Sequence, residues 1–426
     1  MRQIMTCAIV AAALAPAWAD DWPGWRGPSG MGQSAEKNLP VVWAGKDGRN
    51  ILWKVPLFAG TDDVRFDQNQ SSPVVRGDRV FVTLSYWPPA AKPEKELPEH
   101  HVVCFRTSDG LRLWDTRVPA GPWQLTDLRG GYTAPTPAAD GDRVYVLFGS
   151  SVAAALDPDG KLLWRKEITP YAFDVAVGVS PVLYKDTVLF SWDQTNKTSR
   201  LIALDKRTGD IKWEKKRPTA DWAHSTPTLA DVNGKTQLLM ASANALQALD
   251  PNTGETLWTC ASGAKPERIG DTVSPVLAGG LVYTDSGRGG PGIAVDPTGT
   301  GDVTKTHLKW SVPKVNDGSI GSPVAVDEYL YRLFSPDVLH CWRLSDGKEI
   351  FAERLPGVSA VPSAVVTADK RLYFASAGKS YVLAAGPKLE VLGVSDLNDP
   401  SHASPAIADA RLFLRGRRNL YCIASK

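Results

Sequence analysis

Short segments of alternating apolar and polar residues fill the chain from about residue 73 to its end. Residues 79–83 (RVFVT) and 143–147 (RVYVL) are rich in β-branched and aromatic side chains, which favour strands. Each of them follows a Gly-Asp pair, a turn signal that joins neighbouring strands as a hairpin. No stretch between Pro73 and Lys426 keeps a helical period of apolar positions. The pattern predicts an all-β protein.

The predicted strands recur in a repeated unit. Each unit opens with Ser-Pro or Thr-Pro, runs through three strands, turns in a segment rich in Asp, Pro and Gly, and ends in a fourth strand. The opening prolines are Pro73, Pro137, Pro181, Pro227, Pro275, Pro323 and Pro405, and a degenerate copy at Ser363-Ala364 fills the one large gap. After a longer first unit the spacing is about 41–48 residues, which is typical of a four-stranded propeller blade.

The end of the unit carries its most specific signal: a small residue, then Gly six positions later and Trp ten positions later. Ala203, Gly209 and Trp213 show this spacing, and Cys341, Gly347 and Phe351 keep it with Phe in place of Trp. We expect each indole to dock between adjacent blades, where it buries a large flat surface while its N–H finds a carbonyl. The predicted tryptophan-docking residues are Trp53, Trp114, Trp164, Trp213, Trp258 and Trp310.

The number of units predicts how the ring closes. After Pro405 only about three strands fit before Lys426, and the missing fourth resembles residues 50–56 (NILWKVP). The sequence therefore predicts an eight-bladed β-propeller over residues 50–426, closed by N- and C-terminal strands in one blade and preceded by an N-terminal arm at 20–49.

Residues 1–19 read as a secretory signal. Arg2 precedes an apolar run at 4–14, and Ala17-Trp18-Ala19 offers small residues around a cleavage point after Ala19. The apolar run is too short for a membrane anchor, so we expect no integral membrane span. We expect the protein to be a monomer in the periplasm or outside the cell. With 48 basic and 46 acidic residues, the chain is too evenly charged to favour nucleic acid as a partner.

The chain resembles the PQQ-like (pyrroloquinoline-quinone-like) β-propeller repeat family. The resemblance rests on the docking motifs, on residues 71–80 (SSPVVRGDRV) and on residues 21–28 (DWPGWRGP), and it covers essentially the whole mature chain. The family includes quinoprotein dehydrogenases and the BamB-type scaffold of outer-membrane assembly. Because both share the repeat, the fold does not choose between an enzyme and a scaffold.

Two departures bear on that choice. The dehydrogenases carry adjacent cysteines over the quinone and long covering insertions, whereas this chain has no Cys-Cys pair and mostly short loops. We therefore expect no cofactor, and PQQ with calcium is the alternative. The BamB-type relatives carry a lipid-anchor cysteine that this chain lacks, because Cys7 sits too early for one. Cys104, Cys341 and Cys422 share the small-residue slot, which predicts buried thiols and leaves a disulfide or metal role as the alternative.

Polar residues gather just before the repeat-opening prolines and in the loops that open on the same face. These segments join neighbouring blades and converge on the central channel, where a ligand site is expected. The candidate channel-face residues are Gln70, Tyr132, Asp174, Trp222, His224, Arg268, Asp271, Arg288, Asp317 and His402. The alternative is that they only cap solvated turns. In the nearby loop 86–101, Trp87 either anchors the loop or is exposed for a partner, and we favour anchoring.

The sequence therefore favours a non-catalytic exported binding or scaffold protein that engages a protein, a glycan or a small molecule at one propeller face. One alternative is a PQQ-dependent oxidoreductase with the cofactor in the central channel and a channel-loop Asp as base. A second is a metal-assisted hydrolase or lyase at the channel mouth. No catalytic residue or metal ligand is assigned from the sequence.

Overall fold

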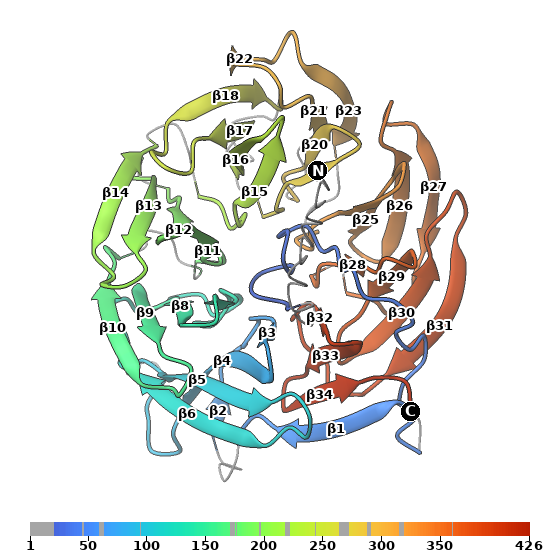
Figure 1. Ribbon diagram of the computed structural model, residues 1–426. Coiled ribbons are helices and arrows are strands. Elements are labelled where there is room, and N and C mark those ends of the chain that lie inside the picture. The colour runs from blue at the N-terminus through green and yellow to red at the C-terminus, as the bar shows by residue number, and fades with distance from the viewer. Residues whose placement is uncertain are drawn as a thin grey trace, which may run out of the picture.

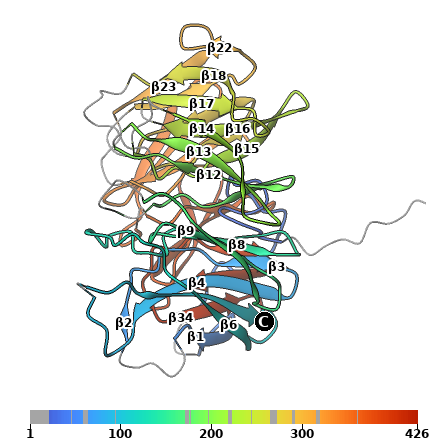
Figure 2. The same cartoon turned by 90° about the vertical axis from the view of Figure 1, so that its left-hand side faces the viewer.

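The computed structural model describes residues 21–44, 47–58, 64–93, 95–170, 175, 177–195, 197–217, 222–242, 244–263, 272–287, 291–314, 319–359 and 361–426. Over these residues the chain is all-β, without a helix. The strands form eight antiparallel sheets arranged around a centre, so the predicted eight-bladed β-propeller is confirmed. Figure 1 looks down the ring and Figure 2 views it from its edge.

The first four blades follow one another along the chain. Blade 1 holds β3 (Val74–Arg76), β4 (Arg79–Trp87), β5 (Glu99–Arg106) and β6 (Arg112–Val118), and short β2 (Arg65–Phe66) pairs with the far end of β4. Blade 2 holds β7 (Ala138–Ala139), β8 (Val144–Phe148), β9 (Val152–Leu156) and β10 (Leu162–Glu167). Blade 3 holds β11 (Val182–Tyr184), β12 (Thr187–Trp192), β13 (Arg200–Asp205) and β14 (Ile211–Lys216). Blade 4 holds β15 (Thr228–Val232), β16 (Lys235–Ser242), β17 (Ala245–Leu249) and β18 (Thr256–Ala261).

The other four blades complete the ring. Blade 5 holds β19 (Val276–Ala278), β20 (Leu281–Thr284), β21 (Pro291–Val295) and β23 (Leu308–Lys314), while its insertion β22 (Gly301–Asp302) lies parallel to β18. Blade 6 holds β24 (Val324–Val326), β25 (Tyr329–Phe334), β26 (Val338–Arg343) and β27 (Glu349–Arg354). Blade 7 holds β28 (Val365–Val366), β29 (Arg371–Phe374), β30 (Lys379–Ala384) and β31 (Glu390–Asp396). Blade 8 holds β32 (Ala406–Ala408), β33 (Arg411–Arg415), β34 (Asn419–Ile423) and β1 (Ile51–Pro56).

Blade 8 contains strands from both ends of the chain. The first strand, β1, pairs antiparallel with the last, β34, and Trp53 lies opposite Cys422. In Figure 1 the blue β1 lies beside the red β34. This pairing covers the outer edge of β34, so a strand from the start of the propeller completes the blade that the end of the chain begins.

The tryptophan contacts between blades follow from the repeat spacing. The small residue on the third strand pairs directly with the aromatic residue on the fourth, as Ala203 does with Trp213 and Cys341 with Phe351. Four indoles then donate Nε1–H to a carbonyl of the next blade: Trp53 to Thr107 (2.8 Å), Trp114 to Pro158 (2.8 Å), Trp164 to Lys206 (3.0 Å) and Trp310 to Leu344 (2.7 Å).

A glycine of the next blade leaves room for each ring. Gly209 has φ +74°, and a Cβ added to it would lie 2.6 Å from the Trp164 ring. Gly254 stands against Trp213 in the same way. Glycine is required at these turns both by the backbone conformation and by the close approach of the indole.

Of the other four blades, blade 3 keeps the glycine contact through Trp213 and Gly254, and blades 4, 6 and 7 depart from the scheme and are each compensated. The indole of Trp258 donates to the side-chain amide oxygen Oε1 of Gln237, in its own blade, at 3.0 Å, and not to a backbone carbonyl of the next blade. In blade 6, where Phe351 replaces Trp, the Tyr331 hydroxyl donates to the carbonyl of Gly386 in blade 7 at 3.0 Å.

In blade 7 a glycine, Gly393, takes the place of the tryptophan opposite Val382. The N-terminal arm covers it, because a Cβ on Gly393 would meet the backbone of Val41 and the side chain of Val42. The buried Trp43 follows them, and its backbone N–H donates to Ser395 Oγ at 2.9 Å. The arm therefore supplies the packing that blade 7 lacks.

The cysteines lie within the sheets. Cys104, Cys260, Cys341 and Cys422 are buried and unpaired, so the prediction of buried thiols is confirmed. Burial raises the pKa of the Cys104, Cys341 and Cys422 thiols to about 12, which keeps them protonated and unreactive at neutral pH.

The arm continues through the middle of the ring, where Figure 1 shows it in blue. Trp22 exchanges both backbone hydrogen bonds with Val75 of blade 1 (3.0 and 2.9 Å), and Pro23 O accepts from Ala139 N of blade 2 (2.7 Å). Farther along, Gly32 O accepts from Val366 N of blade 7 at 2.8 Å. The arm thus adds backbone pairs to inner strands around the channel.

Candidate functional site

A chain of hydrogen bonds links the residues that precede the inner strands. In each link the backbone N–H of one blade's Ser or Thr donates to the hydroxyl of the same position in the next blade. The links run from Ser72 to Thr136, Thr136 to Ser180, Ser180 to Thr226, Ser274 to Ser322, Ser322 to Ser363, Ser363 to Ser404 and Ser404 to Ser72, at 2.8–3.0 Å. This geometry explains why the repeat opens with Ser or Thr: a hydroxyl both accepts and donates where two backbones meet.

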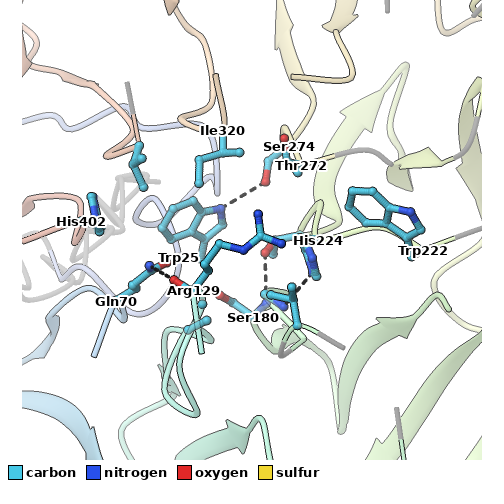
Figure 3. Close-up of a pocket in the computed structure, with 16 residues that line it drawn as sticks. Trp25, Gln70, Arg129, Ser180, Trp222, His224, Thr272, Ser274, Ile320 and His402 are labelled. Carbon is cyan, nitrogen blue, oxygen red and sulfur yellow. Dashed lines mark hydrogen bonds between the residues drawn. The ribbon is translucent and has the colours of Figure 1, made fainter. Parts of the chain in front are cut away.

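The chain of hydroxyls has one gap among these described residues, between Thr226 and Ser274. There the indole Nε1–H of Trp25, from the N-terminal arm, donates to Ser274 Oγ at 3.1 Å. Figure 3 shows Trp25 in the middle of the channel with this bond to Ser274. The arm therefore inserts an aromatic side chain at the point where the link between blades 4 and 5 is missing.

A pocket of about 290 Å³ opens above Trp25 on this face. Segments from all eight junctions between blades contribute to its wall. The lining residues are Trp25, Gln70, Arg129, Gly130, Ala134, Val175, Gly178, Ser180, Trp222, His224, Thr226, Thr272, Ser274, Ile320, Val361 and His402. The convergence follows from the topology, since each segment enters the inner strand of its blade at the channel.

Four of the ten predicted channel-face residues line this pocket: Gln70, Trp222, His224 and His402. In Figure 3, His402 and Trp222 lie on opposite sides of Trp25, with His224 between Trp25 and Trp222. The other predicted positions Asp174, Arg268, Asp271, Arg288 and Asp317 lie outside the described residues. The functional role of all these residues stays a prediction.

Tyr132 lies apart from the pocket. It is buried with Trp87 and Leu125 in a small cluster beneath the loops of blades 1 and 2, and its hydroxyl accepts from Leu125 N at 3.0 Å. Trp87 in this cluster is buried and donates to the Glu96 carbonyl at 2.8 Å, so it anchors loop 86–101 as predicted. Tyr132 packs beneath the loop that carries Arg129 and is not among the described residues that line the pocket.

Among the described lining residues, Arg129 alone carries a permanent charge. Its loop is fixed from several sides: Gln70 Nε2 donates to Arg129 O at 2.7 Å, Asp127 bridges to Val175, and Asp127 Oδ2 accepts from Arg129 Nε at 2.6 Å. The bond to Arg129 lowers the pKa of the Asp127 carboxyl. The Arg129 side chain itself is 75% exposed, and Figure 3 shows its guanidinium over the pocket. A fixed loop thus presents a permanently charged group at the opening.

Two imidazoles add to this wall. His224 Nδ1 accepts from Gly178 N at 3.1 Å, so the proton of the neutral ring resides on Nε2. Desolvation lowers the pKa of His402, which makes its neutral form dominant at pH 7. Neither ring is arranged with a nucleophile among the described lining residues.

One lining residue that sequence reasoning missed, Trp25, comes from the arm, and the others come from the segments between blades. Trp25 belongs to residues 21–28, which were used for the family resemblance and not for the site. Its spacing carries no signal, because the arm lies outside the repeat. The hydroxyl residues Ser180, Thr226 and Ser274 were visible as the Ser/Thr before Pro, but their hydrogen bonds depend on the closed ring.

The described lining residues do not fit the quinone and calcium pair that the family resemblance implies. Calcium is held by carboxylates and carbonyls, and no carboxylate side chain occurs among the described lining residues. The four cysteines of the mature chain are buried in the blade sheets and do not line the pocket. No group of three or more His, Cys, Asp or Glu side chains placed to share a metal ion occurs in the described part of the chain. Within the same part, no helix is long and apolar enough to cross a membrane.

Known proteins resemble this chain in sequence and in fold. Residues 98–353 match the model of the family described as outer membrane protein assembly factor BamB. A quinoprotein ethanol dehydrogenase of Pseudomonas putida is 25% identical over 253 residues, which cover 55% of this chain and 36% of that protein. The chain therefore matches only about a third of the length of this relative.

Two solved structures illustrate the shared fold. BamB from Moraxella catarrhalis superposes with a TM-score of 0.58 at 13% identity, covering 88% of this chain and 98% of that one. The quinohemoprotein alcohol dehydrogenase from Comamonas testosteroni gives a TM-score of 0.63 at 13% identity, covering 96% and 81%. At these identities the likeness concerns the fold. Since the family match spans more than half of the sequence, the chain belongs to the PQQ-like propeller family of the outer membrane protein assembly factor BamB.

Proposed function

We propose that the protein is an exported, non-catalytic binding or scaffold protein that takes a ligand in the channel pocket. The observation that carries the proposal is the convergence of all eight inter-blade segments on one pocket whose floor is Trp25. A concave site lined by apolar and aromatic side chains with a few fixed polar groups is typical of ligand-binding sites.

The signal predicted at residues 1–19 supports a location in the periplasm or outside the cell. Cleavage after Ala19 would leave Asp20 as the first residue of the arm that enters the channel. The family description, an outer membrane protein assembly factor, supports a protein partner as well. Such a partner would bind the propeller outside the channel pocket and would not compete with a ligand in it.

A second candidate is a PQQ-dependent oxidoreductase, which the match to the quinoprotein ethanol dehydrogenase favours. The described lining offers a guanidinium and hydroxyl donors for an anionic quinone, but no carboxylate for its metal. The binding role therefore accounts for the described residues better. The third candidate, a metal-assisted hydrolase or lyase, lacks a ligand set in the described part of the chain.

A ligand screen separates these functions. The mature protein, purified from the cell envelope, is heated in the presence of a panel of sugars, organic acids, nucleotides and peptides, and in a separate arm with PQQ and calcium. We expect a compound from the panel to raise the melting temperature, and a His224→Ala/Trp222→Ala variant to lose that shift. A shift with PQQ and calcium together with dye reduction by alcohols would overturn the proposal in favour of the oxidoreductase. Stabilisation that persists in the double variant would place the ligand elsewhere.

A further inference from the structure

The residue two positions after each repeat-opening proline turns its backbone toward the central channel. In blade 1 this residue is Val75, which lies opposite Val80 and exchanges two hydrogen bonds with the backbone of Trp22 on the arm (3.0 and 2.9 Å). Along an antiparallel strand, alternate residues direct their N–H and C=O groups away from the neighbouring strand. The inner edge of each blade therefore presents one such residue, and a second one where the inner strand is long enough.

The arm binds this position in blades 1, 2, 5, 6 and 7. Besides Val75, its partners are Ala139, Leu277, Ala325 and Val366. Ala139 and Val366 are bound through the backbone of the arm, as Val75 is. The pairing of an extended segment with an inner edge is thus a mode of binding that the ring already uses for its own arm.

Blades 3 and 4 keep the same edge free. The corresponding residues, two positions after Pro181 and Pro227, are Leu183 on β11 and Leu229 on β15, and both are half-buried. In the described part of the chain, no hydrogen bond from outside the blade reaches their N–H or C=O groups. Over residues 24–30 the arm closes hydrogen bonds of 3.1 Å on its own backbone, and it therefore passes these edges without pairing. In Figure 1, β11 and β15 face the centre of the ring.

The edge of β15 is the one best suited to take a further strand. β15 has five residues, whereas the other inner strands have two or three, so Asp231 presents a second N–H and C=O beside those of Leu229. Asp231 is exposed, which leaves this end of the edge open to a partner. Two successive free residues on one edge are the main-chain pattern that strand addition uses.

A small cavity of about 130 Å³ lies beside this edge. Leu183, Leu229 and Pro28 form part of its wall. Trp25 and Thr226 line both this cavity and the channel pocket, and Leu229 lies farther along the chain from Thr226, so the cavity is on the other side of Trp25. Its volume is below the roughly 300–1,000 Å³ of small-molecule sites and suits a single side chain of a peptide.

We infer that the inner edge of β15, at Leu229 and Asp231, takes an extended peptide segment of a protein partner. The segment adds a strand to blade 4 and places one apolar side chain in the cavity beside Leu183. It repeats on blade 4 the pairing that Trp22 makes on blade 1. The inference goes beyond the ligand pocket, and its failure would leave the ligand screen unaffected, because the two sites lie on opposite sides of Trp25.

A phage-displayed library of short random peptides, selected on the mature protein, supplies the probe. We expect the selected peptides to share an apolar residue and to slow the amide hydrogen exchange of residues 228–232 about ten-fold or more, since a paired strand covers the free N–H groups of the edge. The best peptide is then made again with single N-methyl groups along its backbone. N-methylation at the residues that face β15 should weaken binding about ten-fold or more, and at the alternate residues it should leave binding unchanged.

Two variants of one residue test the edge from the side of the protein. Leu229→Pro removes the N–H that faces the channel, and an edge strand tolerates proline where the lost N–H is not part of the ladder. This variant should weaken the selected peptide about ten-fold or more, whereas the matched Leu229→Ala keeps the N–H and should lose less. Melting temperatures show whether both variants fold. If Leu229→Pro does not fold, the N-methyl series decides, because it leaves the protein unchanged.

Peptides that protect another part of the chain, or that bind equally well with an N-methyl group at every position, would overturn the inference. A library from which no peptide binds the mature protein would overturn it as well. Slowed exchange of residues 228–232 with a sugar or an organic acid, and not with a peptide, would assign this edge to a small molecule instead.

Discussion

Trp258 reaches the next blade through a glutamine, because its Nε1–H donates to Gln237 Oε1 at 3.0 Å and Gln237 Nε2 donates to Pro297 O at 3.3 Å. Pro297 lies three positions after the small residue Ala294, as Lys206 does after Ala203. Gln237 therefore relays to blade 5 the hydrogen bond that Trp164 makes directly to Lys206 in blade 3.

Replacing Gln237 with leucine should destabilise the protein. The substitution leaves the fully buried Trp258 N–H and the Pro297 carbonyl without partners, at a cost of about 1–3 kcal/mol in the free energy of unfolding. Urea unfolding followed by fluorescence measures the loss. Gln124→Leu is the control, since Gln124 is exposed, and equal midpoints for the two variants would contradict the relay.

A second prediction concerns the glycine beneath a docking indole. Gly209→Ala should destabilise more than Gly234→Ala, although both glycines have similar left-handed backbones, φ +74° and +77°. The strain of placing alanine there, of order 1–3 kcal/mol, is common to both. Of these two positions, the new Cβ meets an indole at Gly209, that of Trp164, and nothing within 4 Å at Gly234. The clash should add about 1–3 kcal/mol to the loss in unfolding free energy at Gly209.

The difference between the two unfolding free energies isolates the indole contact, because the backbone strain cancels. A Trp164→Ala background supplies a further control, since the extra cost of Gly209→Ala should disappear when the ring is gone. Equal costs at Gly209 and Gly234 would show that Trp164 does not fix the turn.

The sequence predicts the repeated features of the fold but not the contacts that compensate for irregular blades. The period of the repeat and the burial of the cysteines follow from local spacing, and the structure confirms them. The compensations by Gln237 and Tyr331 were not predictable, because their partners Trp258 and Gly386 are 21 and 55 residues away in a geometry that only the closed ring defines.

The candidate site divides in the same way. His224 and His402 share a position three residues before their prolines, and both line the pocket. Trp25 could not be found by such reasoning, because its partner Ser274 is 249 residues away and the arm belongs to no repeat. Tyr132 lies in a segment before a repeat-opening proline, but its side chain packs with Trp87 and Leu125 beneath the loop.

A third prediction uses the buried carboxyl of Asp67 near the junction of blades 8 and 1. Desolvation raises the pKa of Asp67 to about 6, against which the hydrogen bond from Tyr132 N and the charge of buried Arg415 act only in part. A carboxyl with a raised folded-state pKa contributes stability that is present below its unfolded pKa of about 3.8 and is lost as the pH rises through about 6.

Asp67→Asn removes this dependence. Relative to wild type, the variant should gain up to about 3 kcal/mol in unfolding free energy between pH 4 and pH 8, the value of a shift of roughly two pKa units. The measurement is the difference in unfolding free energy between the two proteins at several pH values. Asp142→Asn, at an exposed position, should show a constant difference, and a constant difference for Asp67→Asn would contradict the buried charge.

A fourth prediction separates two tryptophans three residues apart on the arm. Trp22 is buried, pairs through its backbone with Val75 and packs on Gly27, so Trp22→Ala should cost about 3–5 kcal/mol of stability. Trp25 is half-buried at the floor of the pocket, and its main specific contact is the bond to Ser274. Trp25→Ala should therefore lower stability less but weaken the binding of whichever ligand the screen identifies about ten-fold or more, because one aromatic face and the position of the Ser274 hydroxyl are lost together.

Trp25→Phe keeps an aromatic ring and removes the N–H, and its affinity should fall between those of wild type and Trp25→Ala. Calorimetry and thermal unfolding on the same three variants measure both effects. If Trp25→Ala loses as much stability as Trp22→Ala and leaves the affinity unchanged, the arm only closes the channel and Trp25 is no part of the site.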